Sequence, residues 1–383
     1  MKYDFDTAAD RSGTYSFKWD VAEGELPMWV ADMDFRTAPE VTEAVVKRAE
    51  HGIFGYTTVP DEWYGAYISW WKERHAVEYK KNELVFSTGV IPTLSACVRK
   101  FTSPAENVLV MTPVYNVFFN CIKNNGRNVS ESPLIYKEGE YSADLDDLER
   151  KMSDPQTTLM FLCNPHNPVG KIWDRETLGF IGKTALKHGV VVVSDEIHCD
   201  LTDPGREYVP FASVSEECAK NSVICISPTK AFNLAGIQTS AAVSKNPRLR
   251  HRIWRELNTS ECGEPNAFAI DAAAAAFTKG GEWLDELRGY IYQNKLTVKG
   301  FLEKNIPQVK LVPSEATYLL WLDCTDLGIS SAELASHIRR KTGLFLTDGA
   351  RFRGEGFLRM NIACPRVMLL DGLDRLKRAF EML

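Results

Sequence analysis

The strongest constraint on the fold is an alternation of short apolar runs and longer amphipathic runs between Leu84 and Ala242. Runs rich in β-branched residues, separated by helical patterns, are typical of parallel strands joined by helices. The run at 190–194 begins with four consecutive valines, which suits a strand covered on both faces. We therefore predict a layered α/β domain with a mostly parallel central sheet covered by helices. The expected strands are 84–87, 108–112, 159–163, 190–194, 222–227 and 238–243.

A second pattern follows a long helix that is expected from Glu282 to about Lys304. Beyond that helix, strand-like and helical segments alternate again, which predicts a smaller α/β domain. The region before about Phe35 is rich in aromatic residues but weakly periodic, as in an arm that packs against another surface. The predicted division is 1–45 for the arm and part of the small domain, 46–281 for the large domain and 282–383 for the small C-terminal domain.

Composition excludes several classes of protein. The 383 residues include 51 acidic and 45 basic side chains, and a net charge of −6 argues against nonspecific nucleic-acid binding. No run of about 18 apolar residues is present, and the first residues lack the pattern of an export signal, so a membrane role is not expected. Nine cysteines without a CxxC pair indicate reduced thiols and a cytoplasmic protein.

Polar residues follow four of the expected strands, at the sheet edge where open α/β sheets place their ligands. They are a glycine turn at 88–92 (TGVIP), two Asn-Pro turns within 163–170 (CNPHNPVG), Asp195 and Lys230. The glycine turn opens a helix whose free N–H groups could hold a phosphate, and a buried Asp195 would need a cationic partner. Each feature alone also has an ordinary explanation as a turn, a packed side chain or a surface lysine.

A metal site is an alternative at the same sheet edge, because Asp195, Glu196, His198 and Asp200 are all possible ligands. Adjacent residues at an extended strand end point apart, and no second histidine lies nearby in the sequence. We therefore predict no metal.

The order of glycine turn, Asn-Pro turn, strand-end aspartate and strand-end lysine resembles the fold type I enzymes that use pyridoxal 5′-phosphate. More narrowly, five segments resemble the MalY/PatB group of carbon–sulfur β-lyases, and the resemblance extends over nearly the whole chain. These segments are 27–35 (PMWVADMDF), 54–56 (FGY), 163–170 (CNPHNPVG), 195–198 (DEIH) and 358–366 (LRMNIACPR).

The resemblance implies roles around the cofactor ring. Lys230 would bind pyridoxal phosphate covalently and later remove the substrate Cα proton, and Asp195 would pair with the pyridine nitrogen. Asn167 would donate to the phenolic oxygen, and Tyr115 would stack on the ring unless it is only a core residue. His198 lies where many aminotransferases of this fold carry tyrosine, which resembles the lyase branch, with local packing as the alternative.

Further roles follow for the phosphate and the substrate. The backbone of Gly89, Val90 and Ile91 would bind the phosphate together with the hydroxyl groups of Ser227 and Thr229. Tyr56 resembles a tyrosine that reaches the phosphate of the neighbouring subunit, which implies a homodimer with shared active sites. Arg359 would bind the substrate α-carboxylate, with Tyr56 and Asn167 beside it.

The implied reaction is α,β-elimination on an L-amino acid with sulfur at Cβ. L-cystathionine would give homocysteine, pyruvate and ammonia, and cysteine or its S-conjugates would react similarly. An aminotransferase on the same fold is the main alternative, since Lys230, Asp195, Asn167 and Arg359 would serve both reactions. A regulatory protein that acts through protein contact is the alternative from another class.

Overall fold

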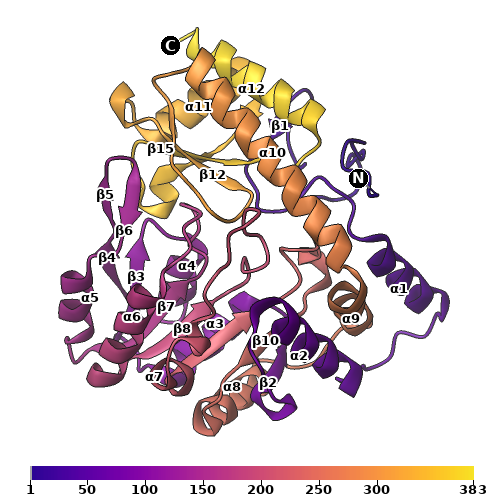
Figure 1. Ribbon diagram of the computed structural model, residues 1–383, viewed down its shortest axis with the longest axis vertical. Coiled ribbons are helices and arrows are strands. Elements are labelled where there is room, and N and C mark those ends of the chain that lie inside the picture. The colour runs from indigo at the N-terminus through magenta and orange to yellow at the C-terminus, as the bar shows by residue number, and fades with distance from the viewer. Residues whose placement is uncertain (1) are drawn as a thin grey trace.

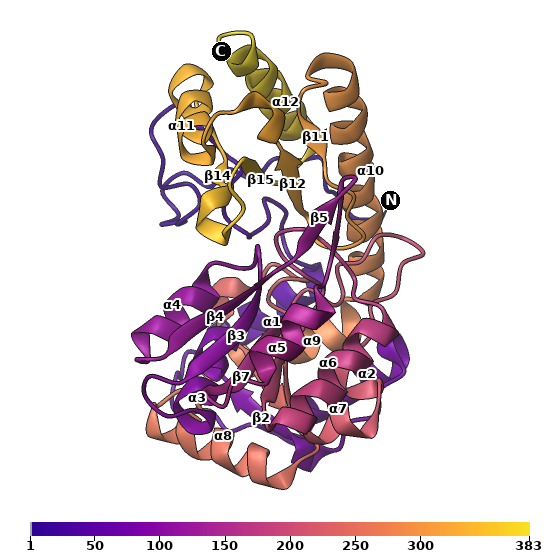
Figure 2. The same ribbon diagram turned by 90° about the vertical axis from the view of Figure 1, so that its left-hand side faces the viewer.

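The computed structural model describes residues 2–383, so only Met1 of the expected 1–45 segment lies outside the described residues. A seven-stranded sheet forms its largest layer, in the order β2-β10-β9-β8-β7-β3-β4 (Figures 1 and 2). Its strands are β2 (Leu84–Ser87), β3 (Asn107–Thr112), β4 (Asn128–Pro133), β7 (Thr157–Cys163), β8 (Val191–Asp195), β9 (Ser222–Ile226) and β10 (Ser240–Val243).

The direction of the strands confirms a mostly parallel sheet with one exception. β3 is parallel to β4 and β7, and β8 is parallel to β7 and β9, whereas β10 runs antiparallel to both β2 and β9. The sequence pattern also did not predict β4. Its residues, NVSESP, are polar and end in proline, as a sheet edge permits.

Apolar side chains fill both faces of the sheet. In β7, Leu159 and Phe161 belong to one buried cluster, while Met160 and Leu162 belong to the other, as the two-residue repeat of a strand requires. The first cluster packs under α3 (Val90–Phe101), α4 (Val117–Asn124) and α8 (Pro247–Thr259). The opposite face is covered by α2 (Asp61–His75), α6 (Arg175–His188) and α9 (Ala269–Lys279). Around them lie α1 (Pro39–Glu50), α5 (Leu145–Met152), α7 (Glu216–Lys220) and the hairpin β5 (Ile135–Lys137) and β6 (Glu140–Ser142).

A smaller antiparallel sheet lies beyond the 25-residue helix α10 (Gly281–Asn305), which extends along the molecule from α9 to α12 (Figure 1). The order of this sheet is β11-β12-β15-β14, with α11 (Ser331–Thr342) packed on β14 and β15, and α12 (Arg366–Phe380) packed against α11 and α10. Its strands are β11 (Lys310–Leu311), β12 (Leu319–Asp323), β14 (Thr347–Asp348) and β15 (Phe357–Asn361). The expected α/β fold with a second, smaller α/β part is confirmed, while the exact domain boundaries stay a prediction.

The N-terminal segment joins this smaller part through backbone pairing. β1 (Leu26–Pro27) pairs in parallel with β13 (Leu344–Phe345), and residues 28–38 then pass between the two sheets without strand or helix of their own. Among residues 2–383, no helix combines the length and apolar character that a bilayer crossing requires.

Candidate active site

The carboxyl ends of the central strands open into a cavity of about 190 Å³. Register explains why polar residues gather there: Asp195 at the end of β8 is level with Cys163 of β7 and Cys225 of β9. The turns that follow β7 and β9 therefore flank Asp195 on its two sides. Nine of the predicted site residues line this cavity: Gly89, Val90, Ile91, Tyr115, Asn167, Asp195, His198, Thr229 and Lys230.

Asp195 is a buried carboxylate that faces this cavity. It is 4% exposed, and its Oδ1 accepts a hydrogen bond from the backbone N–H of Ile197 at 3.2 Å. Burial raises the pKa of Asp195 to about 7, and the positive charge of Lys230 opposes this rise only in part. Among the described residues, Asp195 forms no ion pair, so the site has a buried acid that lacks a bonded cation.

Lys230 lies in the turn after β9 and points across the cavity. Its Nζ donates to the carbonyl oxygen of Ala31 at 2.6 Å. Burial lowers the pKa of Lys230 to about 8, although the negative charges of Asp32 and Asp195 raise it. A lysine with a pKa of about 8 has far more free amine at neutral pH than an ordinary lysine, and the free amine is the form that acts as nucleophile and base.

Arg359 enters the site from β15 of the smaller sheet and is 5% exposed. Its guanidinium donates to the carbonyl oxygen of Trp29 at 3.0 Å and to Oδ1 of Asn167 at 3.3 Å, while its Nε has no partner. Burial lowers the pKa of Arg359 to about 10. The group remains cationic at neutral pH, and no described carboxylate pairs with it, so it is positioned to bind an anion.

Gly89 caps the start of α3, and the N–H groups in the first turn of a helix have no partner within that helix. α3 contacts β8, β9 and β10, which brings this N-terminus to the same edge of the sheet as Lys230. Thr229 lines the cavity, whereas Ser227 lies behind it. The Ser227 hydroxyl donates to the carbonyl oxygen of Thr239 at 2.7 Å and contacts the Thr229 hydroxyl at 2.8 Å. It therefore orients the Thr229 side chain.

Two ring side chains complete the cavity wall. His198 is 4% exposed, its Nδ1 has no partner, and burial lowers its pKa to about 3, so the imidazole is neutral. Tyr115 lines the cavity and contacts Phe118 edge-on, with ring centroids 5.8 Å apart. Burial raises the pKa of the Tyr115 phenol, which therefore stays protonated.

Tyr56 is the one predicted site residue that lies apart from the others. Its side chain is fully exposed and borders a separate hollow with Phe54, Ile237 and Phe268. This hollow adjoins the cavity through one segment, because Gly236 and Ile237 line the hollow while Ala235 and Gln238 line the cavity.

The four acid and histidine residues considered for a metal do not converge. Glu196 turns away from the cavity and accepts hydrogen bonds from Ser194, Tyr208 and the backbone N–H of Phe211. Asp200 instead binds the Trp70 indole at 3.0 Å and the His75 ring at 2.8 Å.

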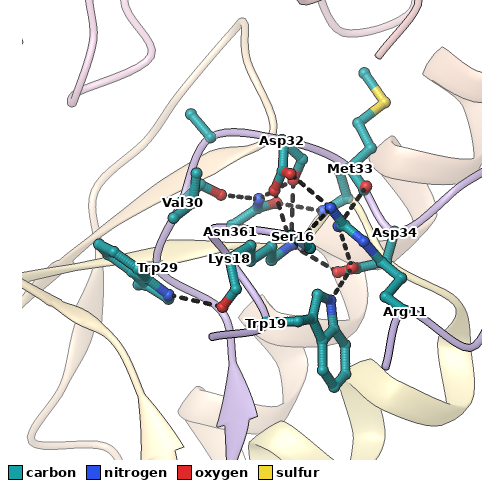
Figure 3. A network of polar contacts seen from close by, with 12 residues as sticks. Arg11, Ser16, Lys18, Trp19, Trp29, Val30, Asp32, Met33, Asp34 and Asn361 are labelled. Atoms are coloured by element: carbon teal, nitrogen blue, oxygen red, sulfur yellow. Dashed lines mark hydrogen bonds and ion pairs between the residues drawn. The ribbon is translucent and has the colours of Figure 1, made fainter. Parts of the chain in front are cut away.

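One part of the site was not predicted from the sequence. Residues 29–33, here named the carbonyl segment, contribute backbone oxygens to the site, and Figure 3 shows the bonds from Asn361 and Arg11 to the oxygens of Val30 and Met33. The oxygen of Trp29 binds Arg359, and the oxygen of Ala31 accepts from Lys230 and from the Tyr318 hydroxyl at 3.1 Å. The resemblance of 27–35 to a family motif includes this stretch but implies no role for its backbone oxygens.

Comparison with known proteins agrees with this geometry. A model of the aminotransferase class I and II family matches residues 26–376. The chain belongs to this family. It is 44% identical to cystathionine beta-lyase PatB of Bacillus subtilis (strain 168), over 98% of this chain and 100% of PatB, and 30% identical to protein MalY of Escherichia coli (strain K12), over 99% of both chains. The solved structure of cystalysin from Treponema denticola, which contains a pyridoxal 5′-phosphate cofactor, superposes with a TM-score of 0.96 at 33% identity and covers both chains fully. The resemblance to the MalY/PatB group is thereby confirmed.

Proposed function

We propose that this protein is a pyridoxal-phosphate-dependent carbon–sulfur lyase. It would cleave L-cystathionine with water to homocysteine, pyruvate and ammonia, and would act similarly on cysteine or its S-conjugates. The observation that carries the proposal is the convergence of Lys230 and Asp195 on one cavity, with Arg359 bonded to Asn167 in its wall, in a chain that is 44% identical over its length to a cystathionine beta-lyase.

The site matches the cofactor at two points and an amino-acid substrate at a third. Asp195 is a buried acid without a bonded cation, and a protonated ring nitrogen would be that cation. The first turn of α3 offers free N–H groups to a phosphate. Arg359 is a buried cation without a carboxylate partner, so it is free to bind the carboxylate of an amino-acid substrate. When bound, pyridoxal phosphate supplies the electron sink that makes a substrate Cα proton acidic.

The residues of the chain divide the remaining work. Lys230 would hold the cofactor and accept the Cα proton at Nζ, because its lowered pKa leaves free amine at neutral pH. Asp195 would keep the ring nitrogen protonated. Arg359 would hold the substrate carboxylate, and its bond to Oδ1 of Asn167 turns the amide N–H groups of that residue toward another acceptor, such as the phenolic oxygen.

The active unit is proposed to be a homodimer. Ile53, Phe54 and Tyr56 are 67%, 57% and 102% exposed, and such a run of apolar side chains is typical of an interface. Its place beside the segment 235–238 supports a role for Tyr56 in the site of the partner subunit. A cytoplasmic location is proposed as well, supported by nine free cysteines, of which eight are buried.

The decisive experiment mixes protein loaded with pyridoxal phosphate and L-cystathionine without any keto acid, and follows pyruvate and free thiol. Equal release of both products by the wild type, and none by Lys230→Ala, is the expected result. Transfer of the amino group only after a keto acid is added would contradict the lyase proposal and identify an aminotransferase.

The shared site has its own test. Lys230→Ala and Tyr56→Ala are each expected to be nearly inactive, but a mixed dimer holds one site with both residues intact. Unfolding, mixing and refolding the two variants together should therefore restore activity. Continued inactivity of a folded mixture would place Tyr56 outside the partner's site.

A further inference from the structure

The carbonyl segment has an unusual mode of support. From Trp29 to Met33, each backbone oxygen accepts a hydrogen bond from a side chain that is distant in sequence, although the segment belongs to no strand or helix. Two of these oxygens bind the cationic site residues, Trp29 to Arg359 and Ala31 to Lys230. The position of this backbone therefore sets the position of both cations.

Lys18 and Asn361 bind the middle of the segment, Val30 and Asp32, from outside the cavity. Nδ2 of Asn361 donates to the oxygens of Val30 and Asp32 at 2.5 and 2.6 Å. Nζ of Lys18 donates to the oxygen of Asp32 at 3.1 Å and forms an ion pair with Oδ2 of Asp34 at 2.6 Å. Asn361 lies two residues beyond Arg359 on β15, hence on the same strand face.

The charges of this network balance. Lys18 and Asp34 are 1% and 4% exposed, which is rare for a lysine and an aspartate unless they are paired. Arg11 adds a second cation, bonded at 2.9 Å to Asp32 and to Asp34, and the Trp19 indole donates to Asp34 at 2.8 Å. The cations Lys18 and Arg11 and the anions Asp32 and Asp34 thus form a neutral, partly buried cluster. This cluster lies behind the carbonyl segment, whose Ala31 oxygen binds Lys230.

We propose that Lys18 and Asn361 are positioning residues: they hold the carbonyl segment so that the oxygens of Ala31 and Trp29 orient Lys230 and Arg359. Neither residue touches the cavity. The effect on catalysis rests on the proposed function. The effect on the Lys230 amine does not, because it can be measured in the cofactor-free protein.

The test is the pKa of the Lys230 amine in cofactor-free protein. It is obtained from the pH dependence of trace acetylation by acetic anhydride, with the modified peptide quantified by mass spectrometry. The charged and titratable groups that face Lys230 are Asp195 of β8, Arg359 of β15 and Asp32, with His198 and Tyr318 in the same wall. A test variant must therefore leave the net charge around Lys230 unchanged.

The double variant Lys18→Met/Asp34→Asn removes one positive and one negative charge, so the net charge near Lys230 is preserved. If the Ala31 oxygen loses its fixed position, the ammonium form of Lys230 loses a charge-assisted hydrogen bond. The pKa of the amine should then fall by about one. In the loaded enzyme, kcat should fall and KM should rise together, since both Lys230 and Arg359 lose their anchors.

A matched control is the other buried lysine–aspartate pair, Lys295 and Asp203, bonded at 2.6 Å and exposed by only 8% and 12% in their side chains. Lys295→Met/Asp203→Asn should lower the unfolding temperature but leave the pKa of Lys230 unchanged. Should the Lys18 double variant fail to fold, Asn361→Ala removes the other two bonds without any change in charge. It should lower the pKa of Lys230 in the same direction.

If the folded Lys18→Met/Asp34→Asn variant keeps the wild-type pKa of Lys230, the proposal is wrong. It is also wrong if the Lys295→Met/Asp203→Asn control lowers the pKa of Lys230 by the same amount. This readout is independent of the reaction. Absence of lyase activity in the wild-type protein would contradict the proposed function, but it would not affect the result on the pKa of Lys230.

Discussion

The two walls of the active site are built by different means. Asp195, Lys230 and the N-terminus of α3 follow elements of the large sheet, and strand register brings them together. The opposite wall is the carbonyl segment, which forms no ladder and is held by side chains of Lys18, Asn233 and Asn361. A sheet can position residues through backbone pairing alone, whereas an irregular segment needs individual hydrogen bonds, so one substitution can displace it.

The largest effect is expected at Asp195, in the wall that the large sheet forms and that is here called the sheet wall. Asp195→Asn should lower kcat by about 10²–10³-fold, because losing one partner of a buried charge pair costs about 3–4 kcal/mol. Pyruvate release under saturating cofactor measures this. The adjacent buried carboxylate provides the control, since Glu196 faces Ser194, Tyr208 and the Phe211 N–H. Glu196→Gln should reduce stability more than kcat, and equal losses in kcat would contradict the assignment.

Arg359 connects the two walls through Asn167 and Trp29. Arg359→Lys keeps the charge but loses the planar fork, and each lost charge-assisted hydrogen bond is worth roughly 1.5–3 kcal/mol. KM should therefore rise by about 10–100-fold, with a smaller change in kcat. Arg366→Lys is the matched control, because Arg366 donates to the Gln293 carbonyl and the Thr297 hydroxyl on α10, away from the cavity. An unchanged KM for Arg359→Lys would remove its role in substrate binding.

The sheet wall should also show itself in the pH dependence of stability. The pKa of Asp195 is raised from 3.8 to about 7 in the folded protein, so the fold binds this proton more tightly than the unfolded chain does. The resulting stabilisation is fully present below about pH 4 and is lost as the pH rises through 7.

Cofactor-free wild type should therefore lose stability relative to Asp195→Asn between pH 4 and 7, by at most about 1.4 kcal/mol per pH unit. Urea unfolding of both proteins at several pH values measures this difference. Addition of the cofactor should abolish it, because a bonded cation keeps Asp195 ionised. A constant difference across this range would refute the raised pKa.

The smallest effect is expected at Tyr115. Tyr115→Leu removes the ring proposed to stack on the cofactor, a contact worth about 0.5–1.5 kcal/mol, so cofactor affinity should fall by about 2–10-fold. Equilibrium binding to cofactor-free protein measures this. Phe118→Leu, which changes the buried ring beside it, should instead affect thermal stability. Equal cofactor affinity in wild type and Tyr115→Leu would make Tyr115 a core residue only.

The same contrast explains what the sequence could reveal. The sheet wall was predicted from apolar runs followed by polar residues, because local pattern determines where a strand ends. The antiparallel direction of β10 was not, since strand direction depends on how the chain returns to the sheet. The carbonyl segment was missed because its function resides in backbone oxygens, which every residue has, and most of its partners lie about 200–330 positions away.

The bonds of Asn233 have a consequence for the order in which the site is made. Its side chain binds the backbone of Met33 and Phe35, while Tyr318, Arg359 and Asn361 bind the same stretch of chain. During synthesis from the N-terminus, the carbonyl segment is made about 330 residues before its partners Arg359 and Asn361. The strands of the large sheet can pair earlier, but the active site must wait until β15 has been made.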